Sequence, residues 1–525
     1  MFVFGPLARS RDRRAGRRRR GNENELASGY DTQRNRAPIE PRTGEGMTQT
    51  VTLPMWMLTI LVLFAAWAVL DRLLLPSVRW YFRRRVNRVI EEINTRFNVE
   101  IAPFKLTQRR VLIDRLLYDP RVQAAVEAEA QAENITRAAV MARIEVYARE
   151  IVPSFNAYVY FRIGYWLAKN CAKFMYRVRI GYVDKKGIAA VAPKSTLVFV
   201  MNHRSNMDYV LVAFLAAEKV ALSYAVGEWA RVWPLQTLIR AMGAYFVRRN
   251  SGDPLYRVVL QRYVQMATEF GVPQAVFPEG GLTVDGKLRA PKLGLLDYMV
   301  KTFDPNGERD LVFVPIGINY DRVLEDRSLL RKLDSGAQRP GTLRTAMISA
   351  GFIAKNLGMM LIGRWRRFGY ACVNVGRPVS MRAYVAAQAL DFRALSDDER
   401  HARVAILARE LMREIGQVIP ALPVALVASI MVRHPGRAFS ELELKSEVFA
   451  LIRRIEERGA HVYIPRQDHD YMIGVGLRML TLRHIVDERE GLYSANAGEA
   501  RLLAYYANAI VHFGDDAGSI RVSSP

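Results

Sequence analysis

Short apolar runs alternate with helical patterns through the middle of the chain. Branched and aromatic apolar residues are concentrated at 196–201, 275–278 and 311–315. Such runs are typical of buried β-strands. The segments between them repeat apolar residues at helical spacing instead. This alternation predicts an α/β domain at about 181–380, with a mixed sheet flanked by helices.

Helical patterns precede and follow this predicted domain. We expect a helical domain at 80–180, where an aromatic, amphipathic stretch at 158–168 is either a buried helix or a helix lying against lipid. Helical spacing returns at 394–418 and 440–458. There Ser396 and Ser440 are placed as N-caps before acidic first turns. The region 381–525 is therefore expected to be helical.

A single long apolar segment lies near the N-terminus, from Leu53 to Pro76. Its length matches the ~20 residues that a membrane-spanning helix needs. Arginines follow it closely, which predicts an inner (plasma) membrane anchor with the next domain facing the cytoplasm; these are Arg79, Arg83, Arg84, Arg85 and Arg88. Because Asp71-Arg72 interrupts the apolar run, an interfacial helix is the alternative.

Residues 1–50 carry the run Arg17-Arg18-Arg19-Arg20 and then a polar stretch without a packing pattern. They are expected to form a disordered basic tail. Because Met47 directly precedes the apolar segment, they are alternatively sequence upstream of the true start.

The chain is strongly basic, with a net charge of +24 over 525 residues and a pI near 10.1. This balance suits nucleic acid, an anionic membrane face or an acidic soluble ligand such as coenzyme A or acyl carrier protein. Two distant cysteines, Cys171 and Cys372, and 7 histidines imply neither a disulfide framework nor a metal site. This usage fits a reducing, cytosolic compartment.

His203 and Asp208 follow the predicted strand at 196–201, where the chain turns toward a helix. Reactive groups of α/β proteins lie at such strand ends. A carboxylate five residues after a histidine can fix its tautomer and leave the other ring nitrogen free to take a proton from a hydroxyl. The chain has no nucleophile elbow such as GxSxG. The pair therefore suits direct attack by a substrate hydroxyl on an acyl donor.

Three further segments follow in order along the chain. Arg248-Arg249 ends an apolar run and has the geometry to grip a phosphate. Glu279 precedes two glycines, Gly280 and Gly281, whose backbone amides can approach an anion. Pro315 places the strand at 314–320 at a sheet edge or at an end that faces the site. Each segment alone is equally compatible with an ordinary turn or strand.

Together, the order His-x4-Asp, Gly-Ala-Tyr-Phe-Val-Arg-Arg, Phe-Pro-Glu-Gly and Val-Pro-Ile resembles the four-block signature of glycerolipid acyltransferases. The residues within these segments are most similar to those of bacterial glycerol-3-phosphate acyltransferases. The resemblance implies an enzyme that moves a fatty acyl group from acyl-CoA or acyl carrier protein to the sn-1 hydroxyl of glycerol 3-phosphate, the first step of phospholipid synthesis. It implies no cofactor, no metal and no nucleic-acid partner.

The resemblance also implies roles for single residues. His203 would act as the general base and Asp208 would orient it. Arg248, with Arg249 as a second candidate, would hold the acceptor phosphate. Glu279, Gly280 and Gly281 would help to bind the acceptor, and Pro315 would shape the acyl-donor side.

This chain departs from the family after its Glu-Gly-Gly, where members often carry phosphate-binding arginines. It has Leu282, Thr283 and Val284 there, and the missing charge could come from Lys287, Arg289 or Lys292. Lysophosphatidate, dihydroxyacetone phosphate or another hydroxylated acceptor therefore stays open. A lipid hydrolase and a basic membrane-binding or nucleic-acid-binding protein are the rival classes.

Overall fold

The computed structural model describes residues 54–65, 102–216, 221–227, 235–248, 251–333 and 367–514. The chain divides into two compact units, Met1–Pro76 and Ser77–Pro525, which are described separately. The basic tail expected at 1–50 lies outside the described residues.

Of the first unit, only residues 54–65 are described, and 55–65 form a helix with exposed side chains. Within the described ranges, no helix combines the length and the apolar character needed to cross a bilayer. The anchor expected at 53–76 is described over this one stretch only, so it remains a prediction.

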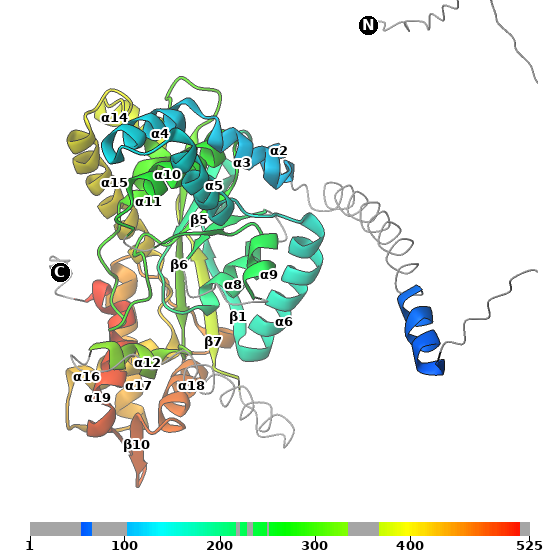
Figure 1. Cartoon of the computed structure of the whole chain (residues 1–525). Coiled ribbons are helices and arrows are strands. Elements are labelled where there is room, and N and C mark those ends of the chain that lie inside the picture. Colours follow the sequence, from blue (N-terminus) through cyan, green and yellow to red (C-terminus); the bar gives the residue numbers. More distant parts are fainter. Residues whose placement is uncertain are drawn as a thin grey trace, which may run out of the picture. The chain divides into compact units, whose positions relative to one another are not determined.

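The second unit is built around an eight-stranded sheet (Figure 1). Its strands run in the order β1-β7-β6-β2-β5-β3-β4, with β8 paired to β6. Their bounds are β1 (Arg177–Val183), β2 (Thr196–Met201), β3 (Ser223–Val226), β4 (Tyr245–Phe246), β5 (Gln274–Val276), β6 (Leu311–Tyr320), β7 (Tyr370–Val375) and β8 (Val379–Ser380).

Five neighbouring strands, β6, β2, β5, β3 and β4, run parallel to one another. β7 and β8 pair antiparallel with β6, and β1 lies parallel to β7. The expected mixed α/β sheet is confirmed. Because parallel strands end at the same edge of a sheet, the segments that follow β2, β4 and β5 share one edge.

Helices cover both faces of the sheet because successive strand side chains point to opposite sides. Val198 and Val200 pack into one core, and Met201 packs into the other. The first core is formed with α3 (Arg109–Leu117), α4 (Pro120–Glu133), α5 (Arg137–Ile151), α10 (Pro254–Glu269), α11 (Gly294–Val300), α14 (Met381–Gln388) and α15 (Asp397–Gln417).

The second core is formed with α8 (Met207–Ala216), α12 (Asp326–Leu330), α16 (Pro423–Arg433), α17 (Glu441–Glu457), α18 (His469–Thr481) and α19 (Ala500–Ala507). A third, smaller cluster joins α8 to the π-helical turn η1 (Val159–Gly164) and α6 (Tyr165–Met175). The remaining elements are α2 (Pro103–Leu106), α7 (Lys185–Ala189), α9 (Leu235–Ala241), η3 (Arg331–Leu333), η4 (Pro465–Gln467), η5 (Ala497–Glu499) and η6 (Asn508–Phe513).

The predicted caps of two C-terminal helices are confirmed. The hydroxyls of Ser396 and Ser440 accept from the backbone N–H groups of Glu399 and Glu443, whose carboxylates bond back to the cap N–H groups. These reciprocal capping boxes fix where α15 and α17 begin. The C-terminal region also contains a small antiparallel sheet that we did not predict, with strands β9 (Ala438–Ser440), β10 (Val486–Arg489) and β11 (Leu492–Ala495).

Of the two positions expected for Pro315, at a sheet edge or at an end that faces the site, the structure excludes the sheet edge. β6 lies in the middle of the sheet, and all ten of its residues are buried. Pro315 sits where the partner of β6 changes from β8, which pairs with Val312 and Phe313, to β7, which pairs from Ile316 onward. A missing backbone N–H interrupts no ladder bond to either of these strands at that point.

Candidate active site

His203 lies in the loop that joins β2 to α8, and Asp208 lies in the first turn of α8. Both side chains are buried, and Nδ1 of His203 lies 2.9 Å from Oδ2 of Asp208. Asn202 holds the loop to β6, because its side-chain amide donates to the carbonyl of Ile318 and accepts from the Ile318 N–H. The structure therefore brings together the two residues that the sequence predicts as a catalytic pair.

The carboxylate of Asp208 is surrounded by donors. Oδ2 faces His203 and accepts from the backbone N–H groups of Arg204 (2.8 Å) and Ser205 (3.1 Å). Oδ1 accepts from the Tyr320 hydroxyl at 2.6 Å. An ionised carboxylate can accept all of these bonds. The arrangement favours a proton on Nδ1 of His203 and a lone pair on Nε2.

Two aromatic rings hold the imidazole of His203. Phe277 stacks on it with ring centroids 4.1 Å apart, and Tyr209 meets it edge-on at 5.4 Å. Across the part of the chain that the structure describes, no group hydrogen-bonds to Nε2. The ring is thus fixed in orientation, with the nitrogen that would accept a proton unengaged.

Glu279 is buried next to the pair, but its carboxylate bonds to the backbone. Its two oxygens accept from the N–H groups of His203 (2.8 Å) and Arg289 (3.0 Å). Burial raises the pKa of this carboxyl to about 7. Glu279 therefore joins two loops of the site. The role in acceptor binding that we expected for it remains a prediction.

The two glycines after Glu279 differ in their surroundings. Gly280 is exposed and has a φ of +66°, and a Cβ there would lie 2.6 Å from Cγ of Lys292. Glycine is thus required by both conformation and space. Gly281 is buried. Lys287, the expected substitute for the family's arginines, has an exposed side chain on the same loop.

Arg204 connects this loop to the C-terminal region. Its buried guanidinium donates to the carbonyls of Gly286 (3.0 Å) and Ala509 (3.1 Å). Desolvation lowers its pKa from the usual arginine value. The buried Arg204 side chain therefore links the loop that contains Gly286 to η6.

Glu325 braces the other side of the β2–α8 loop. Its carboxylate accepts from the Ser205 hydroxyl at 2.7 Å and from the backbone N–H and side-chain amide of Asn206. Burial raises its pKa as well. These bonds engage the polar groups of Ser205 and Asn206, which lie between His203 and Asp208.

Arg248 follows β4 at the same sheet edge, but its guanidinium is already paired. Nε and Nη2 donate to the two carboxylate oxygens of Glu150 at 2.9 and 2.6 Å. The rings of Tyr147 and Tyr256 lie within 5.2 Å of the guanidinium carbon. Glu150 raises the pKa of Arg248. The predicted phosphate ligand is thus held in an ion pair, and Arg249 lies outside the described residues.

Sequence reasoning missed Tyr320, Glu325, Arg204 and Glu150. All four act through contacts with residues distant in the chain, so no local spacing marks them. Only Tyr320, the last residue of an apolar strand, carried a usable signal, because a polar group at a strand end faces the site edge. Within the described ranges, no three or more His, Cys, Asp or Glu side chains are grouped to hold a metal ion.

Both members of the buried His203–Asp208 pair, which follows the parallel strand β2, lie within a segment that the family comparisons match. Residues 182–319, which include both members of the pair, match the family model described as Acyltransferase. Residues 358–514 match the Glycerol-3-phosphate acyltransferase C-terminal region. The predicted resemblance to glycerolipid acyltransferases, and to bacterial glycerol-3-phosphate acyltransferases in particular, is confirmed.

Two curated relatives carry the name glycerol-3-phosphate acyltransferase. The protein of Pseudomonas putida is 26% identical over 78% of this chain and 49% of its own length. That of Xylella fastidiosa is 24% identical over 82% of this chain and 50% of its own length. The chain thus spans about half the length of these relatives. Among solved structures, the 1-acyl-sn-glycerophosphate acyltransferase of Thermotoga maritima is 16% identical, covering 49% of this chain and 79% of its own, with a TM-score of 0.28.

Proposed function

We propose that this chain transfers a fatty acyl group from a thioester donor, acyl-CoA or acyl carrier protein, to the sn-1 hydroxyl of glycerol 3-phosphate. The observation that carries the proposal is the fixed His203–Asp208 contact inside the segment that matches the acyltransferase model. The relatives' names support the acceptor. The product would be lysophosphatidate, which enters phospholipid synthesis.

In this mechanism Nε2 of His203 takes the proton from the acceptor hydroxyl as its oxygen attacks the thioester carbonyl. The C–O bond forms, and the tetrahedral intermediate collapses by breaking the C–S bond. The thiolate then takes the proton from His203, so no acyl group is ever attached to the protein. Asp208 stabilises the imidazolium that exists between the two proton transfers.

The acceptor is tested with detergent-solubilised protein, radiolabelled palmitoyl-CoA and one of three acceptors: glycerol 3-phosphate, lysophosphatidate or water alone. We expect labelled lysophosphatidate as the main product and little free palmitate. Phosphatidate formed faster from lysophosphatidate than lysophosphatidate from glycerol 3-phosphate would overturn the acceptor assignment. Free palmitate as the main product with every acceptor would instead indicate a hydrolase.

We further propose that the protein works at the inner membrane with its catalytic domain on the cytoplasmic side. The face of α6 supports this. Trp166 and Leu167 are 63% and 45% exposed, and Phe174 is exposed about two turns further on. Between Glu150 and Asp184 the chain has no acidic residue and five basic ones, which suits an anionic lipid surface.

Attachment through α6 is tested by placing an environment-sensitive fluorophore on Leu167→Cys. Leu442→Cys, which replaces an exposed leucine of α17, is the matched control; both are made in a Cys171→Ser background. We expect a blue shift on adding vesicles that contain anionic lipid for position 167 only. Equal responses at the two positions would contradict a lipid-facing α6.

A further inference from the structure

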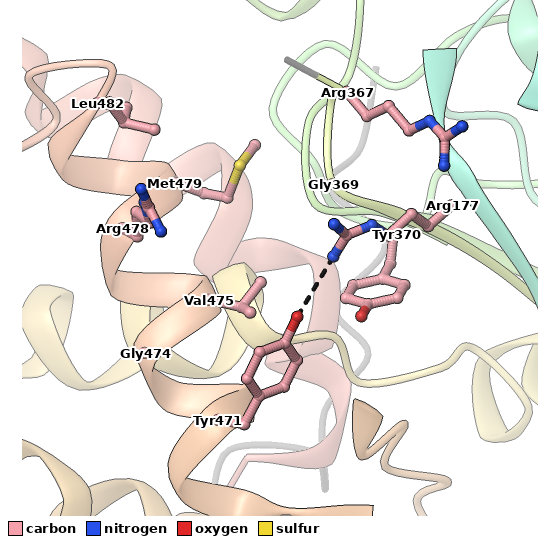
Figure 2. Close-up of a pocket in the computed structure, with 10 residues that line it drawn as sticks. All are labelled: Arg177, Arg367, Gly369, Tyr370, Tyr471, Gly474, Val475, Arg478, Met479 and Leu482. Carbon is pink, nitrogen blue, oxygen red and sulfur yellow. Dashed lines mark hydrogen bonds between the residues drawn. The ribbon is translucent and has the colours of Figure 1, made fainter. Parts of the chain in front are cut away.

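Figure 2 shows the residues that line a cavity of about 690 Å³. One wall is formed by residues at the beginnings of β1 and β7, and the other by one side of α18. No residue of the catalytic pair or of its hydrogen-bonding network lines it. The acyl-transfer mechanism leaves this cavity without a role.

The cavity is positively charged. Arg177, Arg367 and Arg478 line it, and its lining contains no acidic residue. Arg177 is held by a bond from Nη1 to the Tyr471 hydroxyl at 3.4 Å. Across the described part of the chain, Arg367 and Arg478 form no ion pair. Guanidinium groups without carboxylate partners are suited to bind a phosphate.

The wall formed by α18 is apolar between these charges. Val475, Met479 and Leu482 follow one another at helical spacing along the cavity, and Leu482 is half exposed. Gly474, on the same helix, has open space where a Cβ would lie. The cavity therefore offers a cationic region and an adjoining surface on which an alkyl chain can be buried.

We propose that this cavity binds an anionic amphiphile, a phosphate ester that carries an acyl chain. Such a ligand matches both the arginines and the apolar side of α18. Two sources have this chemistry: a membrane lipid with a phosphate headgroup, and an acyl thioester whose carrier bears phosphates. This site is separate from His203, so ligand binding here can be tested independently of the acyl-transfer reaction.

The test measures binding to the full chain by titration calorimetry, with no acyl-transfer reaction in progress. The probes are dihexanoylglycerol phosphate, hexanoyl-CoA, glycerol 3-phosphate and dihexanoylphosphatidylcholine. We expect the first or the second to show binding that is lost when the cavity is altered, and the probe that does so identifies the source. The phosphatidylcholine lacks net negative charge and should bind at least about tenfold more weakly. Glycerol 3-phosphate lacks the chain, so any binding of it should occur at the His203 site and should be the same in a variant whose cavity is filled.

Two variants locate the bound probe. Gly474→Leu fills the cavity and removes a helix-weakening glycine, so it should fold normally while lowering affinity by about tenfold or more. Arg478→Gln should weaken binding by a similar factor because it removes a charge-assisted contact. Arg409→Gln, which replaces an exposed arginine on α15, is the matched control and should bind as the wild type does.

If Gly474→Leu and Arg478→Gln both bind the amphiphile with wild-type affinity, the ligand sits elsewhere and the proposal is wrong. It is equally wrong if the phosphatidylcholine binds as tightly as the anionic probes. Thermal unfolding of each variant establishes that it is folded. Acyl-transfer rates, measured separately, report on the His203 mechanism and leave the binding result unaffected.

Discussion

At the scale of single residues, the site depends on the hydrogen-bond donors that surround the carboxylate of Asp208. Asp208 faces the imidazole with one oxygen and takes the Tyr320 hydroxyl on the other. A histidine base is effective only while its tautomer is fixed. Tyr320 touches no reacting atom in this account, so it acts as a positioning residue through Asp208.

Removing the Tyr320 hydroxyl should slow the reaction without weakening substrate binding. A hydrogen bond to a charged group contributes roughly 1.5–3 kcal/mol, so we expect Tyr320→Phe to lower kcat about tenfold while KM for both substrates stays nearly constant. The control is Tyr245→Phe, since within the described residues the Tyr245 hydroxyl is buried without a partner. Equal kcat values for the two variants would remove Tyr320 from the mechanism.

Glu279 makes a separate contribution to the pH dependence of stability. Burial raises its pKa from 4.5 to about 7, so the folded chain holds a proton that the unfolded chain releases in this window. Stability conferred by such a group is fully present below about pH 4.5 and is lost as the pH rises through about 7. Glutamine at this position does not titrate.

Thermal unfolding of the wild type and Glu279→Gln between pH 4.5 and 8.5 tests this. The unfolding midpoint of the wild type should fall relative to that of the variant as the pH rises to about 7, and the difference should be constant above it. Groups shared by both proteins, such as the buried Asp321, cancel in this comparison. Two parallel curves over the whole range would show that Glu279 is ionised throughout.

At the scale of elements, the sequence pattern was sufficient to predict a helix or strand where its evidence lies within one short segment of the chain. The run at 196–201 coincides with β2, and the serine caps mark the starts of α15 and α17. Pairings between distant segments have no such pattern. Nothing near Arg248 in the sequence indicates that α5 places Glu150 against it. For the same reason, the two-residue strand β4 is too short to show an alternation.

The ion pair between Glu150 on α5 and Arg248 after β4 affects how Arg248 could bind the acceptor phosphate. Glu150 binds Nε and Nη2 of Arg248, and no described residue hydrogen-bonds to Nη1. If Arg248 binds the acceptor phosphate through Nη1, Glu150 orients it. Removing Glu150 would then leave the charge in place but unfixed, and binding should weaken.

We therefore expect Glu150→Ala to raise KM for glycerol 3-phosphate about threefold to tenfold, and Arg248→Ala to raise it further, with smaller effects on kcat. The double variant should be no worse than Arg248→Ala alone, because the two residues act on one contact. Steady-state kinetics of the three variants measure this. Unchanged KM values together with lowered thermal stability would mean that the ion pair is only structural.

At the scale of the whole molecule, the C-terminal region is built into the site. Arg204 donates to the carbonyl of Ala509, and the Asn508 side chain donates to the carbonyl of Asp285. A Cβ on Gly286 would lie 2.0 Å from the carbonyl oxygen of Tyr505. The loops that hold His203 and Glu279 thus depend on a region that the sequence predicted only as further helices.

The motifs located the pair because its two members are close in sequence and follow a strand. They could not show that Glu279 faces the backbone or that Arg248 is already paired, because these facts depend on the fold of distant segments. The sequence could therefore predict the His203–Asp208 contact, but it could not predict the surroundings of the residue assigned to the phosphate contact.

General-base catalysis by His203 is tested by the acyl-transfer rates of His203→Ala and Asp208→Asn, in protein whose folding is established by thermal unfolding. A general base contributes about 10²–10⁴-fold, so kcat for lysophosphatidate formation should fall by at least about a hundredfold in His203→Ala and substantially in Asp208→Asn. A folded His203→Ala protein that keeps the wild-type rate would show that His203 is not the general base.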